Sequence, residues 1–128
     1  MKDTTTLNSF IDSWLAAWAG NKPEILLDYY TPDVFYLDPA NPNGLRGKEQ
    51  LFEYLKKLLQ KNPNWKWSTE EIFPTEKGFT LKWKAEVPIG SENLSIYGLD
   101  IVEMTNNKIS RNEVYFDRYD WLIKIMKK

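Results

Sequence analysis

The spacing of apolar residues changes once along this chain of 128 residues, and the change restricts the folds open to it. Up to about residue 61 the apolar residues recur at intervals of three and four, which is the repeat of an amphipathic helix. Beyond Asn62 they alternate with polar residues, which is the repeat of a strand with one buried face. A helical first half followed by strands indicates an α+β fold in which a sheet packs on helices.

Three helices are predicted in the first half, over residues 7–18, 23–30 and 48–61. A short strand over 34–38 precedes the third helix, which Asn62-Pro63-Asn64 ends. Four further strands are predicted over 65–74, 78–88, 94–105 and 108–120. Short turns rich in Gly and Asn join these four strands into an antiparallel meander. We expect one domain over 1–128, with a curved sheet wrapped around the helices.

Neither histidine nor cysteine occurs in the chain. Their absence excludes Cys–His and Ser–His nucleophilic pairs, and it excludes thiolate or imidazole zinc sites. Any acid–base chemistry must therefore use Asp, Glu, Tyr or Lys. Aromatic residues make up 15% of the chain, more than core filling normally needs, and they commonly line small-molecule pockets. We expect a hydrophobic small-molecule ligand and neither a cofactor nor a metal.

The charges are balanced, with 17 basic and 18 acidic residues and a net charge of −1. Lys and Arg form no stripe along one element, so nucleic acid is not an expected partner. The first six residues lack the apolar core of a signal peptide, and no apolar run is long enough to cross a bilayer. These features predict a cytoplasmic protein with no membrane partner.

The segment from Asp38 to Gly47 contains two prolines and two glycines, which predicts an ordered turn before the third helix. Asp38 opens this turn and has two interpretations. In one, its carboxylate faces a pocket as a general base. In the other, it accepts hydrogen bonds from the turn's own backbone, as Asp-Pro turn openers commonly do. The turn by itself favours the structural interpretation.

A second carboxylate interrupts an apolar row in the strand over 94–105. One face of that strand carries Leu94, Ile96, Gly98, Asp100, Val102 and Met104. Burying an ionised Asp100 costs several kcal/mol unless it finds donors or keeps its proton through a raised pKa. A raised pKa on a pocket wall indicates a functional group, whereas a hydrogen bond from the backbone or a tryptophan is the structural alternative. The opposite face is also partly apolar, so the reverse phase stays open.

The predicted outer face of the sheet carries its own apolar side chains. They are Tyr97, Leu99, Ile101 and Tyr115. A patch of this kind is typical of a self-association surface, so we expect a homodimer through the outer face of the sheet. Scattered surface hydrophobic residues are the alternative.

Several segments together resemble one known family. They are Trp14-Leu15-Ala16-Ala17-Trp18, Leu27-Asp28-Tyr29-Tyr30, the turn from Asp38 to Gly47, Gly98-Leu99-Asp100 and Tyr115-Phe116-Asp117. Over nearly the whole chain they resemble the SnoaL-like branch of the nuclear-transport-factor-2-like (NTF2-like) superfamily. The resemblance implies a cone in which a strongly bent sheet surrounds three helices and leaves a pocket at its open end. It defines the reaction less well, because the superfamily contains isomerases, cyclases, epoxide hydrolases, dehydratases and noncatalytic adaptors.

In motif positions the chain is most similar to ketosteroid isomerase. The resemblance implies that Asp38 is the general base and that a protonated Asp100 donates a hydrogen bond to an enolate oxygen, a pairing known from that enzyme. The family's oxyanion-hole tyrosine aligns with Trp14, which can donate one hydrogen bond but cannot exchange a proton. Tyr54 is a substitute donor in one interpretation and a core residue in the other. The expected pocket residues are Trp14, Trp18, Tyr30, Tyr54, Trp83, Asn112, Val114 and Phe116.

Two other branches fit less well. The Asp-Arg-Asp cluster of limonene epoxide hydrolase has Val114 in the place of one aspartate, and SnoaL-type cyclase pockets often contain a histidine that this chain lacks. The prediction is therefore an enzyme of the ketosteroid-isomerase or SnoaL type that moves a proton next to a carbonyl of a hydrophobic cyclic substrate. The alternative is a noncatalytic ligand-binding or dimerising adaptor module.

Overall fold

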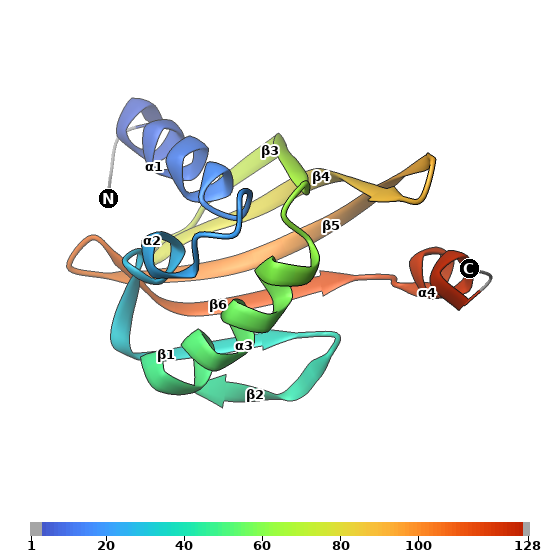
Figure 1. The fold of residues 1–128 in the computed structure, drawn as a ribbon. Coiled ribbons are helices and arrows are strands. Elements are labelled where there is room, and N and C mark those ends of the chain that lie inside the picture. The colour runs from blue at the N-terminus through green and yellow to red at the C-terminus, as the bar shows by residue number, and fades with distance from the viewer. Residues whose placement is uncertain (1–3, 127–128) are drawn as a thin grey trace.

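The computed structural model describes residues 4–126 and contains three helices in the N-terminal half (Figure 1). They are α1 (Thr4–Ala16), α2 (Pro23–Leu27) and α3 (Gly47–Lys61). In α3 every fourth residue, Leu51, Leu55 and Leu59, is fully buried, so one stripe of the helix faces the sheet. In α1 the buried stripe includes Ile11 and Trp14.

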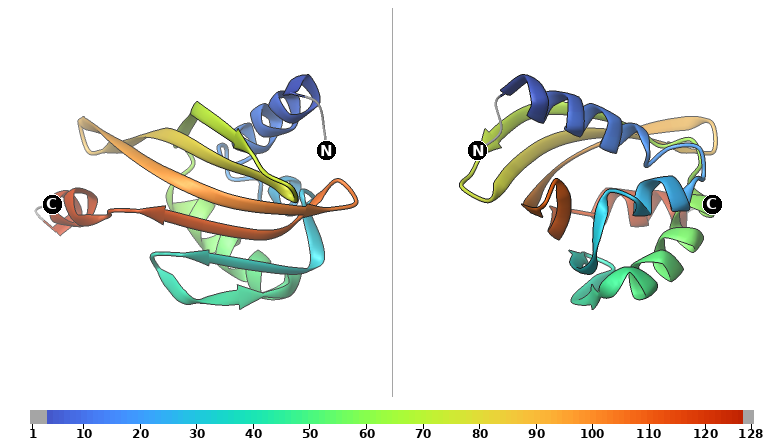
Figure 2. Two further views of the ribbon diagram at one scale, coloured as in Figure 1. Left: turned by 180° about the vertical axis from the view of Figure 1, so that it is seen from behind. Right: turned by 90° about the vertical axis from the view of Figure 1, so that its left-hand side faces the viewer.

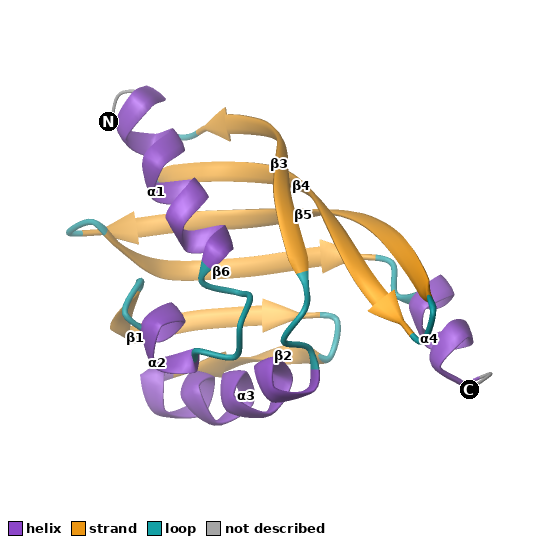
Figure 3. Cartoon of the chain, turned by 45° about the horizontal axis from the view of Figure 1, so that its top comes forward, coloured by secondary structure: helices purple, strands orange, loops and turns teal. Residues whose placement is uncertain are grey.

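Six strands form one sheet. They are β1 (Tyr30–Asp38), β2 (Asn41–Arg46), β3 (Lys66–Pro74), β4 (Gly78–Ile89), β5 (Glu92–Thr105) and β6 (Lys108–Phe116). Their order is β2-β1-β6-β5-β4-β3, and the sheet is mixed because β1 runs parallel to β6 while the other neighbours are antiparallel. The three N-terminal helices cover one face, α1 on the β3 side and α3 on the β1–β2 side (Figures 2 and 3). The predicted α+β class is confirmed.

The predicted strong curvature of the sheet is wrong. The sheet is not strongly curled, and it ends at the free edges of β2 and β3. Bulges bend a sheet locally, and the other four strand pairs each contain a shift of register. The strands β4 and β5, however, pair without a shift from Gly78↔Glu103 to Ile89↔Glu92. The longest pair of strands is therefore regular, and the sheet does not fold round into a narrow cone.

Several element boundaries also differ from the prediction, and the first helix ends at Ala16 instead of residue 18. The second helix ends at Leu27, and the following strand begins already at Tyr30. The predicted turn contains β2, an edge strand that pairs with β1 alone, where Pro42 is tolerated. The last strand ends at Phe116 instead of residue 120, and a helix that the sequence did not predict follows, α4 (Tyr119–Met126).

The buried face of the sheet is the predicted one. In β4 the residues Phe79, Leu81, Trp83, Ala85 and Val87 are buried. In β5 the row containing Asp100 is turned inward, while Tyr97 and Leu99 are exposed. No helix within residues 4–126 is long and apolar enough to cross a membrane.

Candidate functional site

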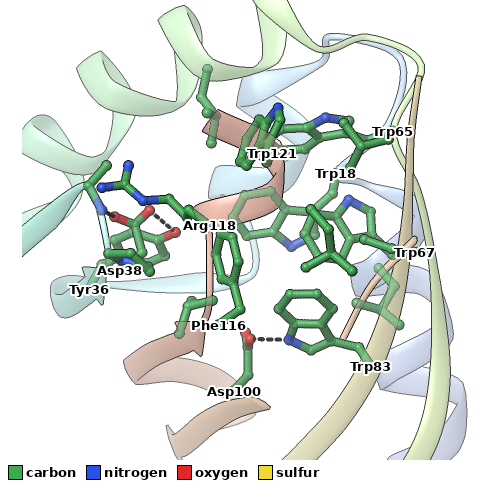
Figure 4. Close-up of a pocket in the computed structure, with 18 of the residues that line it drawn as sticks. Trp18, Tyr36, Asp38, Trp65, Trp67, Trp83, Asp100, Phe116, Arg118 and Trp121 are labelled. Carbon is green, nitrogen blue, oxygen red and sulfur yellow. Dashed lines mark hydrogen bonds between the residues drawn. The ribbon is translucent and has the colours of Figure 1, made fainter. Parts of the chain in front are cut away.

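A cavity of about 200 Å³ lies between the inner face of the sheet and the helices (Figure 4). Its wall takes side chains from α1, β1, α3, β3, β4, β5, β6 and α4. Five of the six tryptophans of the chain contribute, namely Trp18, Trp65, Trp67, Trp83 and Trp121. Asp38, Asp100 and Arg118 are the charged residues of the wall.

Five aromatic side chains of the wall form a closed circuit of contacts, which we call the aromatic cluster. Its members in order are Trp65, Trp67, Trp83, Phe116 and Trp121. Neighbouring centroids are 4.7–6.3 Å apart, and four of the five contacts are edge-to-face. Four pairs of neighbouring walls are therefore steeply inclined to each other, while Phe116 and Trp121 are stacked, and α4 completes the circuit through Trp121.

Trp83 owes its position to a missing side chain on the neighbouring strand. Gly98 pairs with Trp83 across β4 and β5, and a Cβ atom there would lie 2.4 Å from the Trp83 ring. Only glycine leaves room for the indole at this point. The Trp83 Nε1–H then donates a 2.7 Å hydrogen bond to Asp100 Oδ1.

Asp38 closes β1 and is saturated with hydrogen bonds. Its Oδ2 accepts from the hydroxyls of Tyr36 at 2.8 Å and Tyr54 at 2.6 Å. Its Oδ1 accepts from the backbone N–H groups of Ala40 and Asn41, both at 3.0 Å, and from the Asn41 side chain at 2.9 Å. Both interpretations of the turn therefore apply in part, because one oxygen caps the backbone and the other holds two phenols of the cavity wall.

Asp100 receives two hydrogen bonds, one from Trp83 and one at 2.9 Å from the Asn112 side chain. Asn112 in turn accepts from the Tyr30 hydroxyl at 2.9 Å, and Tyr30 accepts from Trp14 Nε1 at 3.2 Å. An indole nitrogen can only donate, so Trp14 fixes the direction of the whole chain of hydrogen bonds. At the end of this chain the Asn112 side-chain N–H donates to the Asp100 carboxylate.

Burial raises the pKa of Asp100 to about 6. The hydrogen bonds from Asn112 and Trp83 oppose this rise, and the negative charge of Asp38 adds to it. Burial also raises the pKa of Tyr36 and Tyr54 well above the ordinary tyrosine value, and Asp38 reinforces both shifts. Both phenols therefore stay protonated as donors to Asp38.

The structure brings both predicted carboxyls and most predicted pocket residues to one cavity. Trp18, Tyr54, Trp83, Val114 and Phe116 lie on its wall together with Asp38 and Asp100. The other three predicted residues are buried in the chain of hydrogen bonds behind Asp100. They are Trp14, Tyr30 and Asn112.

Other wall residues were not anticipated from the sequence, among them Tyr36, Trp65, Trp67, Arg118 and Trp121. The Trp-Lys-Trp spacing at 65–67 is a usable signal, because alternate residues of a strand share a face. Arg118 and Trp121 could not be found this way, since their positions depend on a helix that the sequence did not predict. Within residues 4–126 no group of three potential acidic ligands could hold a metal ion.

Solved structures with the same fold have little sequence in common with this chain. A protein from Catenulispora acidiphila with a ketosteroid isomerase-like fold, in complex with trimethylamine, is 17% identical, with a TM-score of 0.74 and coverage of 84% of this chain and 85% of that one. TerC, co-crystallised with polyporic acid, is 17% identical, with a TM-score of 0.77 and coverage of 92% and 96%. An epoxide hydrolase from Mycobacterium tuberculosis that resembles limonene epoxide hydrolase is 16% identical, with a TM-score of 0.75 and coverage of 98% and 93%.

These identities establish the fold alone. A search of curated proteins finds no significant match. The model of the SnoaL-like domain, however, matches residues 11–112, from the second half of α1 to Asn112 beside Asp100. The chain therefore belongs to the SnoaL-like family, as its sequence motifs predicted.

Proposed function

We propose that the cavity binds a small hydrophobic cyclic molecule and moves a proton next to its carbonyl group. The observation that carries the proposal is a buried carboxyl, Asp100, that lies on an aromatic cavity wall and has a pKa of about 6. A general base works best when its pKa lies near the working pH. Trimethylamine, polyporic acid and epoxide chemistry in structures of this fold support a small-molecule site here.

The hydrogen bonds favour a division of roles opposite to the one that the family resemblance implies. Asp38 accepts five hydrogen bonds, which leaves no free lone pair for a substrate proton. Asp100 accepts only two and has room for a third. In this proposal Asp100 is the proton-transfer residue, and Asp38 positions Tyr36 and Tyr54.

The proposed step begins with ionised Asp100. One carboxylate oxygen takes a proton from the carbon next to the carbonyl, the C–H bond breaks, and its electron pair moves to the carbonyl oxygen as an enolate. Arg118 lies on the same wall and acts electrostatically on Tyr54, so a cation is available to stabilise the enolate charge. Asp100 then returns the proton to a second carbon and is ionised again.

The size of the cavity limits the substrate. Ligand pockets for drug-sized molecules commonly enclose about 300–1,000 Å³. A cavity of about 200 Å³ suits a molecule of one or two rings better than a steroid.

The test is hydrogen–deuterium exchange at the α-carbons of cyclohexanone in D₂O, followed by NMR at pH 7.5. Wild type should accelerate exchange, and Asp100→Asn should reduce the acceleration by about 10²–10⁴-fold, the usual contribution of a general base. Asp38→Asn should lose less, because it acts through the tyrosines. Unchanged exchange in Asp100→Asn would remove Asp100 from the mechanism.

A noncatalytic binding module is the second candidate. The observations that favour it are the saturated Asp38 and the presence of Trp14, which cannot exchange a proton, at the family's tyrosine position. A wild type that binds cyclohexanone without accelerating exchange would support this candidate over the enzyme.

We also propose a homodimer through the outer face of the sheet. Tyr97, Leu99 and Tyr115 are 54%, 41% and 47% exposed there, and Leu99 pairs directly with Tyr115 across β5 and β6. Light scattering over a concentration series should give twice the chain mass, and Leu99→Lys should shift it to the monomer mass. A wild type that stays monomeric throughout would exclude this interface.

A further inference from the structure

We propose that the aromatic cluster around the cavity, together with Asp100, selects an organic cation, so that the ligand carries an alkylammonium group. The inference deepens the proposed function by naming the ligand class of the same site. It rests on that function only in taking the cavity as the ligand site.

The walls have the arrangement that a compact alkylammonium group needs. Trp65, Trp67 and Trp83 follow one another with interplanar angles of 83° and 77°, and Trp121 closes on Trp65 at 71°. Rings that stand at right angles around a small space present several π systems to one occupant. Tryptophan is the aromatic side chain that attracts cations most strongly, and aromatic boxes of this kind recognise quaternary ammonium groups.

The indole nitrogens do not explain why tryptophans are placed here. Trp65 Nε1 and Trp67 Nε1 are buried and have no hydrogen-bond partner within the described part of the chain. Each is a polar group buried at a cost in free energy, which a phenylalanine would avoid. The larger π surface is the property that a tryptophan adds at these positions.

The negative charge next to the aromatic cluster calls for a positive ligand. Asp100 and Asp38 are 5% and 6% exposed, and neither belongs to a salt bridge found within residues 4–126. The charged residue that acts on Asp100 is Asp38, which is also negative. Arg118, the positive residue of the cavity wall, lies beside Asp38 (Figure 4) and acts on Tyr54. Trp83 connects the aromatic cluster with the carboxylate, because its indole belongs to the cluster and its N–H donates to Asp100. A cation inside the aromatic cluster would offset the negative charge of Asp100.

A metal ion would not suit the same place. A small hard cation needs several oxygen ligands to replace its water, and the described residues hold no such cluster. An alkylammonium ion sheds water more readily and prefers apolar surfaces, which make up most of this wall.

The test compares two molecules of the same shape, choline and 3,3-dimethylbutan-1-ol, which differ in the charge of one atom. Isothermal titration of the wild-type protein at pH 7.5 should show choline binding at least about tenfold more tightly. This comparison needs no variant and therefore does not depend on the folding of one. Equal or tighter binding of the neutral alcohol would overturn the proposal, and so would a lack of choline binding at millimolar concentration.

Variants then separate the two contributions. Trp67→Phe keeps an aromatic wall with a smaller π surface and loses no hydrogen bond, so it should lose part of the preference for choline, while Trp67→Leu should lose most of it. Asp100→Asn should weaken choline about tenfold and leave the alcohol unchanged. The control is Phe73→Leu, an exposed aromatic on edge strand β3 outside the cavity, which should change neither. If Trp67→Leu keeps the full preference for choline, the aromatic cluster is not the source of the selectivity for a cation.

The choline comparison and the cyclohexanone exchange test the cation proposal and the proposed function separately. A site that accelerates cyclohexanone exchange but does not prefer choline keeps the proton-transfer proposal and refutes the cation. A site that prefers choline but accelerates no exchange keeps the cation and refutes proton transfer.

Discussion

Asp38 and Asp100 line the same cavity and are buried to nearly the same extent, but their surroundings differ. Asp38 ends a strand beside an open turn, where three N–H donors and two phenols converge on it. Asp100 sits in the middle of the sheet, where neighbouring backbone groups pair with one another and only two side chains reach it. Burial alone therefore does not decide how a carboxyl behaves. The number of donors that the local backbone and its neighbours can supply decides it.

The largest difference between the two carboxyls should appear in stability. Asp38→Ala leaves the buried phenol of Tyr36, the half-buried phenol of Tyr54 and three N–H groups without their acceptor, at about 1–3 kcal/mol for each that stays unpaired. We expect the free energy of unfolding in urea to fall by about 4 kcal/mol.

The matched control is Asp33→Ala on the same strand. Asp33 is exposed and accepts one hydrogen bond, from Thr31, so its loss should cost less than about 1 kcal/mol. Equal losses for the two variants would mean that the Asp38 cluster is no more than a surface turn.

Asp100 should make the free energy of unfolding fall as the pH rises. Its pKa is raised from 3.8 to about 6 in the folded protein, so the folded state binds the proton more tightly than the unfolded state. The resulting stabilisation is complete below about pH 4 and is lost as the pH rises through 6. The shift corresponds to about 3 kcal/mol.

The measurement is the difference in unfolding free energy between wild type and Asp100→Asn at pH 4, 5, 6 and 7. Wild type should lose about 3 kcal/mol relative to the variant over this range, because asparagine does not ionise. Most other titrating groups cancel in the difference. Parallel curves would show that Asp100 ionises normally, and both its role as a base near pH 6 and the comparison with Asp38 would fail.

The sequence predicted part of this comparison. The alternation of apolar residues placed Asp100 on the buried face, and the family motifs brought Asp38 to the same pocket. A tryptophan donor to Asp100 was one of the alternatives, and Trp83 is that donor. The other partners were not predictable, because Tyr54 and Asn112 lie 16 and 12 residues away and meet the carboxyls only in the folded chain.

The fold was predictable where the hydrophobic period was long. Helix α3 and strand β4 contain several repeats of their period, so their type and buried face follow from the sequence. The type of β5 follows as well, but its buried face stayed open because both of its faces carry apolar residues. Strand β2 was missed because Asn41-Pro42-Asn43-Gly44 consists of turn residues and is held by pairing with β1. Helix α4 was missed because it is short, although Asp117, which accepts a hydrogen bond from Tyr119 N–H, forms a turn directly before it.

The pKa of Asp100 should also depend on each of its two donors, Trp83 and Asn112. Asn112→Leu deletes the hydrogen bond to Oδ2 and also leaves the Tyr30 hydroxyl without its acceptor. A hydrogen bond to an ionised group favours the ionised form, so the pKa of Asp100 should rise from about 6 to about 7 or higher. The measurement is NMR titration of the Asp100 side-chain carboxyl carbon. A pKa that stays near 6 would show that Asn112 supports packing and not the charge.

The smallest effect should come from the far end of the same chain of hydrogen bonds. Trp14→Phe removes the 3.2 Å hydrogen bond to Tyr30 but leaves Tyr30 donating to Asn112 and Asn112 donating to Asp100. The pKa of Asp100 should therefore rise by less than about 0.5, well below the effect of Asn112→Leu. The same NMR titration measures it, and choline affinity in the same variant should stay within about twofold of wild type, because Trp14 is not among the cavity-lining residues. A shift as large as that of Asn112→Leu would mean that the chain polarises as one unit, and Trp14 would then tune Asp100 from behind the wall at the position where the family places its tyrosine.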